Sequence, residues 1–206
     1  DSVLLRIHAL PLSPVANDTA VCEGMSVPNI TAAGTNIKWY DNAALGIPLA
    51  SGEGYATGNS LPGSYKYFVT QTDSIYGCES KPDSVVLMIN TTPVAPSATD
   101  NAICYGAGMP VLSATGTNIK WYNDSTKSNL VNTGLLFNTG LTDTGVYHYF
   151  VSQTINNCES KTEEVILTIK ALPVTPIATD YEICEGAGSA ILVASGSNIE
   201  WYGDAA

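Results

Sequence analysis

The sequence predicts an all-β protein made of tandem sandwich domains of about 80 residues each. Two observations carry this prediction. The phrase GTNIKWY occupies residues 34–40 and returns at residues 116–122, and GSNIEWY follows at residues 196–202. The last strand expected in each repeat alternates with period 2, and no stretch shows helical periodicity. The repeat length of about 80 residues is too long for a solenoid unit and suits an independently folding β domain.

The repeats set the expected domain boundaries. Proline pairs open each copy as short semi-rigid joints, at Pro11/Pro14, Pro93/Pro96 and Pro173/Pro176. We expect the last strand of a preceding repeat at residues 1–10, whole repeats at 11–92 and 93–172, and the first strands of a further, truncated repeat at 173–206. The sequence is therefore expected to be a piece of a longer chain.

The strands of one repeat are expected to bury one face. In the last strand Val85, Leu87 and Ile89 have aliphatic counterparts in every copy, whereas the alternate positions vary. This alternation is typical of a half-buried antiparallel strand. The predicted core also includes large aromatic residues, namely Trp39, Trp121, Trp201, Tyr65 and Tyr147. The next tyrosine in each phrase should face outward, so Tyr40, Tyr122 and Tyr202 are candidates for surface binding.

Turn residues separate about seven short strands in each repeat, with a tryptophan in the third strand. TDTGVY at residues 142–147 resembles the D-x-G-x-Y corner of immunoglobulin-type sandwiches. LPGSY at residues 61–65 keeps the glycine and the tyrosine but lacks the aspartate, so the corner is only partly supported there. These features predict immunoglobulin-like (Ig-like) domains.

The phrases ending in WY, together with YFVSQT and CES, resemble the Ig-like repeats of large surface proteins of Bacteroidota, which include adhesins and gliding-associated proteins exported by the type IX system. The resemblance covers nearly the whole chain and implies an extracellular, cell-surface segment that acts as a stalk or an adhesive fibre. Its implied partners are neighbouring repeats, other copies in a fibre, and surface glycans or proteins. The alternatives are a carbohydrate- or protein-binding module that uses the variable loops 41–59 and 123–141, and a non-catalytic appendage of a secreted enzyme.

Charge and motifs argue against other classes of function. The formal net charge is −11, which disfavours nucleic acid and anionic membranes as partners. No apolar run approaches the roughly 18 residues of a membrane span. No catalytic, phosphate-binding or metalloprotease motif is present, and neither His8 nor His148 recurs between copies. We therefore expect neither an enzyme nor a resident cofactor.

Five cysteines, two in each whole repeat, predict disulfides and an oxidising compartment. The simple pairing is within each repeat, Cys22 with Cys78 and Cys104 with Cys158, and Cys184 would find its partner outside the fragment. However, Cys22 and Cys78 lie in turns that a plain Ig-like sandwich places at opposite ends, beyond the reach of a disulfide. A short first strand could still leave Cys22 near the hairpin of Cys78 and keep the pairing within the repeat. A pairing between neighbours, Cys22 with Cys158 and Cys104 with a cysteine beyond the fragment, also stays open and would join the repeats into a covalent rod.

Two further kinds of site are candidates. Asp18, Asp100 and Asp180 recur at the joints, where carboxylates could bind Ca²⁺, although such residues also cap turns. Asp followed by Ser or Thr and then an aliphatic residue or Thr resembles the O-glycosylation signal of Bacteroidota. On that resemblance the candidate acceptors are Ser2, Thr19, Ser74, Ser84 and Ser125, and the competing interpretation is ordinary turn chemistry.

Overall fold

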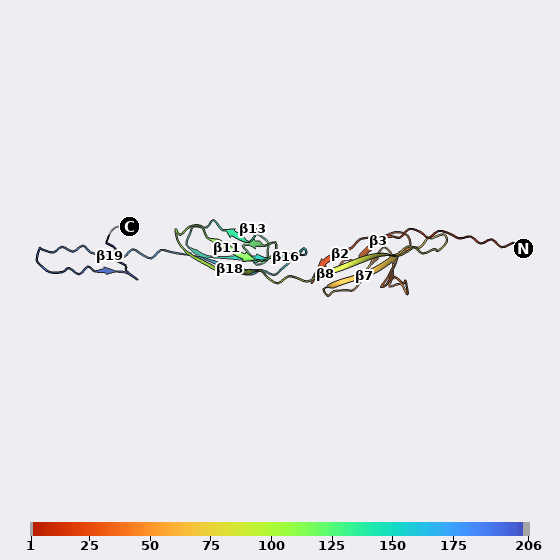
Figure 1. Ribbon diagram of the computed structural model, residues 1–206, viewed down its shortest axis with the longest axis horizontal. Coiled ribbons are helices and arrows are strands. Elements are labelled where there is room, and N and C mark those ends of the chain that lie inside the picture. Colours follow the sequence, from red (N-terminus) through yellow and green to blue (C-terminus); the bar gives the residue numbers. More distant parts are fainter. Residues whose placement is uncertain (1, 204–206) are drawn as a thin grey trace.

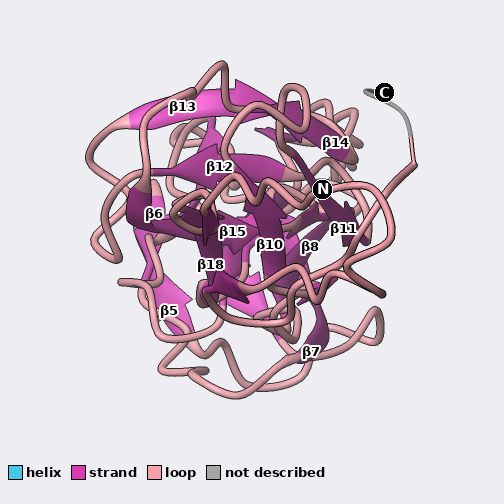
Figure 2. Cartoon of the chain, turned by 90° about the vertical axis from the view of Figure 1, so that its left-hand side faces the viewer, coloured by secondary structure: helices cyan, strands magenta, loops and turns pink. Residues whose placement is uncertain are grey.

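The structure is a computed structural model that describes residues 2–203. Two β-sandwiches lie in a row along the long axis, with the N-terminal segment at one end and the C-terminal segment at the other (Figure 1). We call residues 11–92 the first sandwich and residues 93–172 the second. Strands, turns and loops make up the described residues (Figure 2), which contain no helix that could cross a membrane. The prediction of an all-β tandem fold is confirmed.

Each sandwich has a five-stranded and a three-stranded sheet. The sheets of the first sandwich have the orders β2-β8-β7-β4-β5 and β1-β3-β6. Its strands are β1 (Val15–Ala16), β2 (Thr19–Cys22), β3 (Ile30–Ala33), β4 (Lys38–Tyr40), β5 (Ala50–Ser51), β6 (Gly54–Tyr55), β7 (Gly63–Thr70) and β8 (Asp83–Asn90).

The second sandwich repeats this topology, with the sheet orders β10-β18-β15-β12-β13 and β14-β11-β9. It adds a short hairpin, β16-β17, after the strand β15. Its strands are β9 (Ser97–Ala98), β10 (Asn101–Cys104), β11 (Val111–Thr115), β12 (Lys120–Tyr122), β13 (Leu130–Thr133), β14 (Leu136–Asn138), β15 (Gly145–Ser152), β16 (Thr154–Ile155), β17 (Cys158–Glu159) and β18 (Glu163–Lys170).

Each sandwich has its own hydrophobic core between its sheets. In β8 the three constant aliphatic side chains, Val85, Leu87 and Ile89, are at most 2% exposed, as their alternation predicts. Burial of each contributes about 1.5–3 kcal/mol. Trp39 and Trp121 are fully buried at the equivalent centres of the two cores. Because no core residue is shared, each sandwich is a separate packing unit.

The tyrosine corner is present in both sandwiches. Tyr65 donates its hydroxyl to the Leu61 carbonyl at 2.9 Å, and Tyr147 donates to the Asp143 carbonyl at 3.0 Å. The acceptor is a backbone carbonyl, so the corner forms in the first sandwich although the aspartate is missing there. Both tyrosines are half-buried against their cores, as predicted.

The first strand region of each sandwich crosses from one sheet to the other. In the first sandwich β1 pairs with β3 in the small sheet, and β2 then joins the large sheet parallel to β8. Asp18 lies at the crossing and accepts the Val86 N–H at 2.8 Å; Asp100 accepts the Ile166 N–H at the same distance. Parallel pairing carries β2 toward the end of β8, so Cys22 lies opposite Asn90.

Residues 173–203 form one small antiparallel pair, β19 (Ile177–Ala178) with β20 (Ala194–Ser195). The prediction that Trp201 is a core residue is wrong for this structure, because its side chain is 56% exposed. Trp121 is covered because β12 lies next to β15 in a complete sandwich, and the described residues after position 201 hold no strand of that kind.

Candidate functional site at the joint between the sandwiches

A disulfide between Cys22 and Cys158 joins the two sandwiches, with a Cα–Cα distance of 5.5 Å. The favoured expectation of pairing within each repeat, Cys22 with Cys78 and Cys104 with Cys158, is therefore wrong, and the pairing between neighbours holds. Cys158 is 1% exposed, so the contact between the sandwiches covers it. In Figure 1 the β16 end of the second sandwich faces the β2 end of the first.

The strand order explains why pairing within a repeat fails. Cys22 lies beside the last residue of β8, whereas Cys78 lies in the hairpin that precedes the first residue of β8. Eight strand residues at about 3.3 Å each separate these positions by more than 20 Å. A disulfide requires Cα atoms within about 7 Å, so Cys22 cannot reach Cys78 and instead bonds to the hairpin of the next sandwich.

A tight hairpin presents Cys158 to the first sandwich. β16 and β17 are joined by two residues with positive φ, Asn156 at 50° and Asn157 at 62°. Asparagine tolerates this left-handed conformation, which favours a two-residue turn. Asn90 donates its side-chain N–H to the Asn156 carbonyl at 3.5 Å, and the Cys22 Sγ lies 3.7 Å from the Asn157 carbonyl oxygen. The hairpin tip therefore contacts the end of β8 as well as Cys22.

A glutamine in each repeat holds the linker that enters its sandwich. The Gln153 amide accepts the Thr117 N–H at 3.0 Å and donates to the Val94 carbonyl at 2.9 Å. Gln71 makes the same two bonds, to the Thr35 N–H and the Leu12 carbonyl. Because the linker is tied to the sandwich that follows it, the joint has less freedom to bend than a free proline linker.

The glycine of the repeated phrase makes room for this glutamine. A Cβ on Gly116 would lie 2.7 Å from Gln153 Oε1, and a Cβ on Gly34 would lie 2.6 Å from Gln71 Oε1. The asparagine two positions later has φ of 48° in both copies and donates to a carbonyl at the base of the hairpin, Thr72 in the first sandwich and Thr154 in the second. The phrase thus recurs because it builds the linker and hairpin end of each sandwich.

A glutamate next to each hairpin cysteine gathers three side-chain donors. Glu159 accepts from Lys120 Nζ at 2.8 Å, from the Tyr122 hydroxyl at 2.8 Å and from Ser152 Oγ at 2.7 Å. Burial opposes its ionisation, but these hydrogen bonds and the Lys120 charge outweigh burial and lower its pKa to about 2. Burial and the same carboxylate raise the pKa of Tyr122 to about 12. The ionised glutamate ties the base of the hairpin to the large sheet.

The first sandwich has the equivalent cluster around Glu79, with Lys38, Tyr40 and Thr70. The expectation that Tyr40 and Tyr122 offer an outward binding surface is wrong, since they are 2% and 5% exposed. Their faces are covered because a hairpin glutamate lies over each and receives its hydroxyl. Tyr202 is 74% exposed.

The three other cysteines, Cys78, Cys104 and Cys184, take no part in a disulfide within the described residues. Cys104 and Cys184 are exposed, and Cys78 is half-buried. Each lies at a position equivalent to one partner of the interdomain disulfide. Cys104 and Cys184 correspond to Cys22, and Cys78 corresponds to Cys158.

The calcium sites stay a prediction. Asp18 and Asp100 use their carboxylates to accept backbone N–H groups, as described above, and Asp180 is exposed. Within residues 2–203 no group of three or more His, Cys, Asp or Glu side chains comes together in a way that could hold a metal ion.

The glycosylation candidates also stay predictions. Ser2, Ser74 and Ser125 are exposed, whereas Thr19 in β2 and Ser84 in β8 are half-buried strand residues. The variable loops 41–59 and 123–141 contain edge strands of both sheets, β5 and β6 in the first sandwich and β13 and β14 in the second. In the second loop Asp124 accepts hydrogen bonds from Thr126, Ser128 and Asn129, which hold its pKa well below the ordinary value.

Sequence reasoning missed the two residues that organise the joint, the glutamine and the glutamate. Both recur in the repeated phrases, as Gln71 and Gln153 in YFVTQ and YFVSQ and as Glu79 and Glu159 in CES. The signal that could have found them is this recurrence of a polar residue beside a strand end. The recurrence alone does not show what each side chain binds.

The chain was compared with solved structures, with curated protein sequences and with models of protein families. One solved structure that matches is the tandem Ig repeats of Dlar, with 12% identity and a TM-score of 0.29; the match covers 78% of this chain and 100% of that one. Another is human CDH23 EC21–23, with 10% identity and a TM-score of 0.32; the match covers 91% of this chain and 80% of that one. No curated protein sequence matches the chain. The family model described as "Ig-like domain CHU_C associated" matches residues 11–90 and again residues 93–170. The chain therefore belongs to this family of Ig-like domains.

Proposed function

We propose that the chain is a structural segment of a long secreted protein and serves as a stiff stalk that holds other parts of that protein away from a cell surface. The observation that carries this proposal is the disulfide between Cys22 and Cys158. It joins neighbouring sandwiches directly and bypasses the linker between them. A module that served only as a flexible tether would gain nothing from such a bond.

The energetics of the joint support a rod. In the chain-entropy account, closing a loop across a sequence separation of 136 residues stabilises the folded state by about 5 kcal/mol. The Gln153 bonds to the linker and the Asn90 bond to the hairpin tip resist bending at the same place. These covalent and hydrogen-bonded links between neighbouring sandwiches favour an end-to-end arrangement.

The proposed location is the outside of the cell. A disulfide persists in oxidising compartments, and Ig-like repeats are commonly extracellular. The resemblance to repeats of Bacteroidota surface proteins extends the proposal to export by the type IX system and to an adhesive fibre. The net charge of −11 supports a soluble surface that repels other copies of itself except at specific contacts.

The stalk is tested by small-angle X-ray scattering of the full chain with and without the interdomain disulfide. We expect the oxidised chain to keep one extended shape, and the double variant Cys22→Ser/Cys158→Ser to show a broader distribution of shapes with a smaller mean radius of gyration. The variant Cys78→Ser is the matched control. Identical scattering from the double variant and the wild type would contradict a disulfide-stiffened stalk. Antibody labelling of intact cells that make the natural protein tests its location, and labelling only after lysis would contradict it.

A further inference from the structure

A loop of the second sandwich, residues 123–129, is tied to the hairpin that carries Cys158. Lys127 in this loop donates its Nζ to the Ser160 carbonyl at 3.0 Å and lies 3.8 Å from Glu159 Oε1. Glu159 and Ser160 directly follow Cys158 in the chain, and Ser160 is 1% exposed. A loop from the variable part of the repeat therefore contacts the base of the hairpin that forms the joint.

The backbone of this loop is held so that Lys127 reaches the hairpin. Lys127 has a φ of 61°, a left-handed conformation that is unfavourable for a lysine. Asp124 maintains it, because its carboxylate accepts the N–H groups of Ser128 and Asn129 and the Thr126 hydroxyl. An unfavourable backbone conformation that its surroundings maintain indicates a position with a specific role.

Hydrogen bonds connect this contact with the linker between the sandwiches. Ser160 and Gln153 bond to each other twice: the Ser160 N–H donates to the Gln153 carbonyl at 2.9 Å, and the Ser160 Oγ accepts the Gln153 N–H at 3.0 Å. The Gln153 side chain in turn donates to the Val94 carbonyl in the linker. A continuous path therefore runs from Lys127 through Ser160 and Gln153 to the linker, beside Cys158.

The first sandwich has the same turn with a different side chain. Leu45 occupies the position equivalent to Lys127, with a φ of 55°, and its N–H donates to the Asn42 carbonyl at 3.4 Å. A leucine side chain has no donor, so it cannot bond to the carbonyl of Ser80, the counterpart of Ser160. The two copies keep the shape of the turn, and the residue at its left-handed position decides whether the loop is fastened to the hairpin.

We propose that Lys127 is a latch, which fastens the loop 123–129 to the Cys158 hairpin and thereby limits opening of the joint between the sandwiches. This inference rests on the proposed stalk function and assigns part of the stiffness of the stalk to a loop that varies between copies. Each repeat sets the strength of its own joint through the residue at this position. A ligand or a modification that withdraws Lys127 from Ser160 loosens the joint.

The test is the rate at which a reductant opens Cys22–Cys158 in the folded full chain, measured by quenching, alkylation and peptide mapping. Because Cys158 is 1% exposed, movement of the hairpin away from the first sandwich should speed the attack. Lys127→Met keeps a long side chain without charge or donor, and its disulfide should be reduced about threefold faster, as the loss of a partly exposed ion pair implies. Lys127→Arg keeps a donor and should be reduced at nearly the wild-type rate.

Lys161→Met is the matched control, since it removes the same charge from an exposed residue beside the same hairpin. Repeating the measurement in low concentrations of urea separates local opening from global unfolding. Movement of the hairpin exposes little new surface, so the rate should barely change with urea, whereas global unfolding exposes much. Equal rates for Lys127→Met and Lys161→Met, or rates that rise steeply with urea, would overturn the inference.

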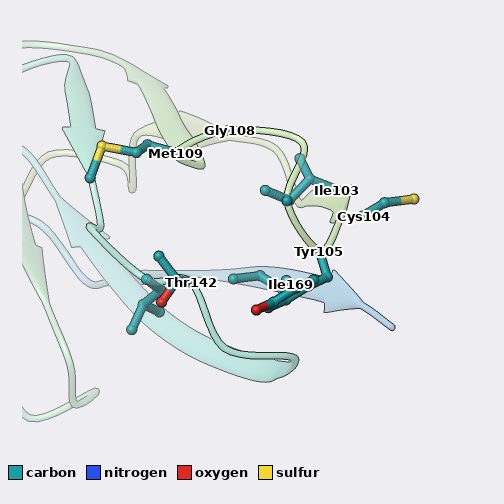
Figure 3. Close-up of a pocket in the computed structure, with 9 residues that line it drawn as sticks. Ile103, Cys104, Tyr105, Gly108, Met109, Thr142 and Ile169 are labelled. Carbon is teal, nitrogen blue, oxygen red and sulfur yellow. The ribbon is translucent and has the colours of Figure 1, made fainter. Parts of the chain in front are cut away.

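The converse change can be made in the first sandwich. Leu45→Lys places a lysine in the same turn, where it should bond to the hairpin of the half-buried Cys78. Iodoacetamide should then alkylate Cys78 about threefold more slowly than in the control Leu45→Met, for the same reason. Cys104 is the internal reference, because Figure 3 shows its sulfur pointing outward beside an apolar pocket.

An unchanged rate of alkylation at Cys78 would argue against the latch. The peptide map of the untreated chain also separates the latch from the stalk. If the map lacked Cys22–Cys158, the stalk itself would be contradicted and the latch with it. If the bond were present and the rates of reduction were equal, the latch alone would be wrong.

Discussion

The interdomain disulfide predicts how far the chain can be stretched. When the two ends are pulled, the shortest covalent path runs from residue 22 directly to residue 158 through the disulfide. The 135 residues between these cysteines carry no load and cannot extend, even if both sandwiches unfold. Replacing Cys22 by serine removes the shortcut. At about 3.5 Å per extended residue, the contour length of the unfolded chain should then rise by about 470 Å.

The assay is single-molecule force spectroscopy with handles at the two ends of the full chain, under non-reducing conditions. The wild type should show the short contour length, and a reducing agent should convert it to the length of the Cys22→Ser variant. Cys78→Ser removes a cysteine outside this disulfide and should behave as the wild type.

The size of the gain separates the possible pairings. If Cys22 were bonded to Cys78, the same substitution would release only the 55 residues between them, or about 190 Å. A gain near 190 Å, or no gain at all, would refute the disulfide between sandwiches.

Three further predictions concern contacts within each sandwich. Glu159→Ala should destabilise the second sandwich by about 2–3 kcal/mol in urea unfolding, because three donors lose a charged acceptor. Since the pKa of Glu159 is lowered from 4.5 to about 2, its contribution to the free energy of unfolding is complete above pH 4.5 and is lost as the pH falls through 2. If the free energy of unfolding depended on pH in the same way in the wild type and in Glu159→Gln, this reasoning would be wrong. Gly34→Ala should lower the free energy of unfolding by about 1–3 kcal/mol, because the new Cβ clashes with Gln71. Gly46→Ala is the control, since its Cβ meets no atom within 4 Å. Equal melting temperatures for the two variants would rule out the clash. Asp100→Ala should lower the free energy of unfolding by about 1 kcal/mol, because the Ile166 N–H loses its acceptor, and Asp100→Asn, which keeps an acceptor, should lower it much less. If EDTA lowered the melting temperature of the wild type, this would instead support a calcium site.

The sequence predicts the fold well because its signals are local. The alternation in Val85, Leu87 and Ile89 depends only on the two faces of a strand, and all three are buried as expected. Trp39 and Trp121 follow the same rule. The prediction fails for Trp201 because burial also requires neighbouring strands, which the alternation within one strand cannot supply.

The joint could not be predicted with the same certainty, because it depends on which sheet the first strand joins. Nothing in the residues of β2 shows that it pairs in parallel with β8, yet this pairing carries Cys22 to the far end of the sandwich. Tyr40 was misjudged for a related reason. Its alternation with Trp39 correctly places it on the other face, but that face is covered by Glu79, which lies 39 residues further along the chain.

The connection between Cys22 and Cys158 also changes what a protease can do to the protein. A peptide bond cut at any position between these cysteines leaves the segments before and after them covalently joined. The exposed loops 41–59 and 123–141, where proteolytic nicking is expected to begin, both lie inside this protected interval. Cleavage there can damage a sandwich without severing the chain. A surface stalk built in this way keeps its two ends attached after repeated proteolytic damage.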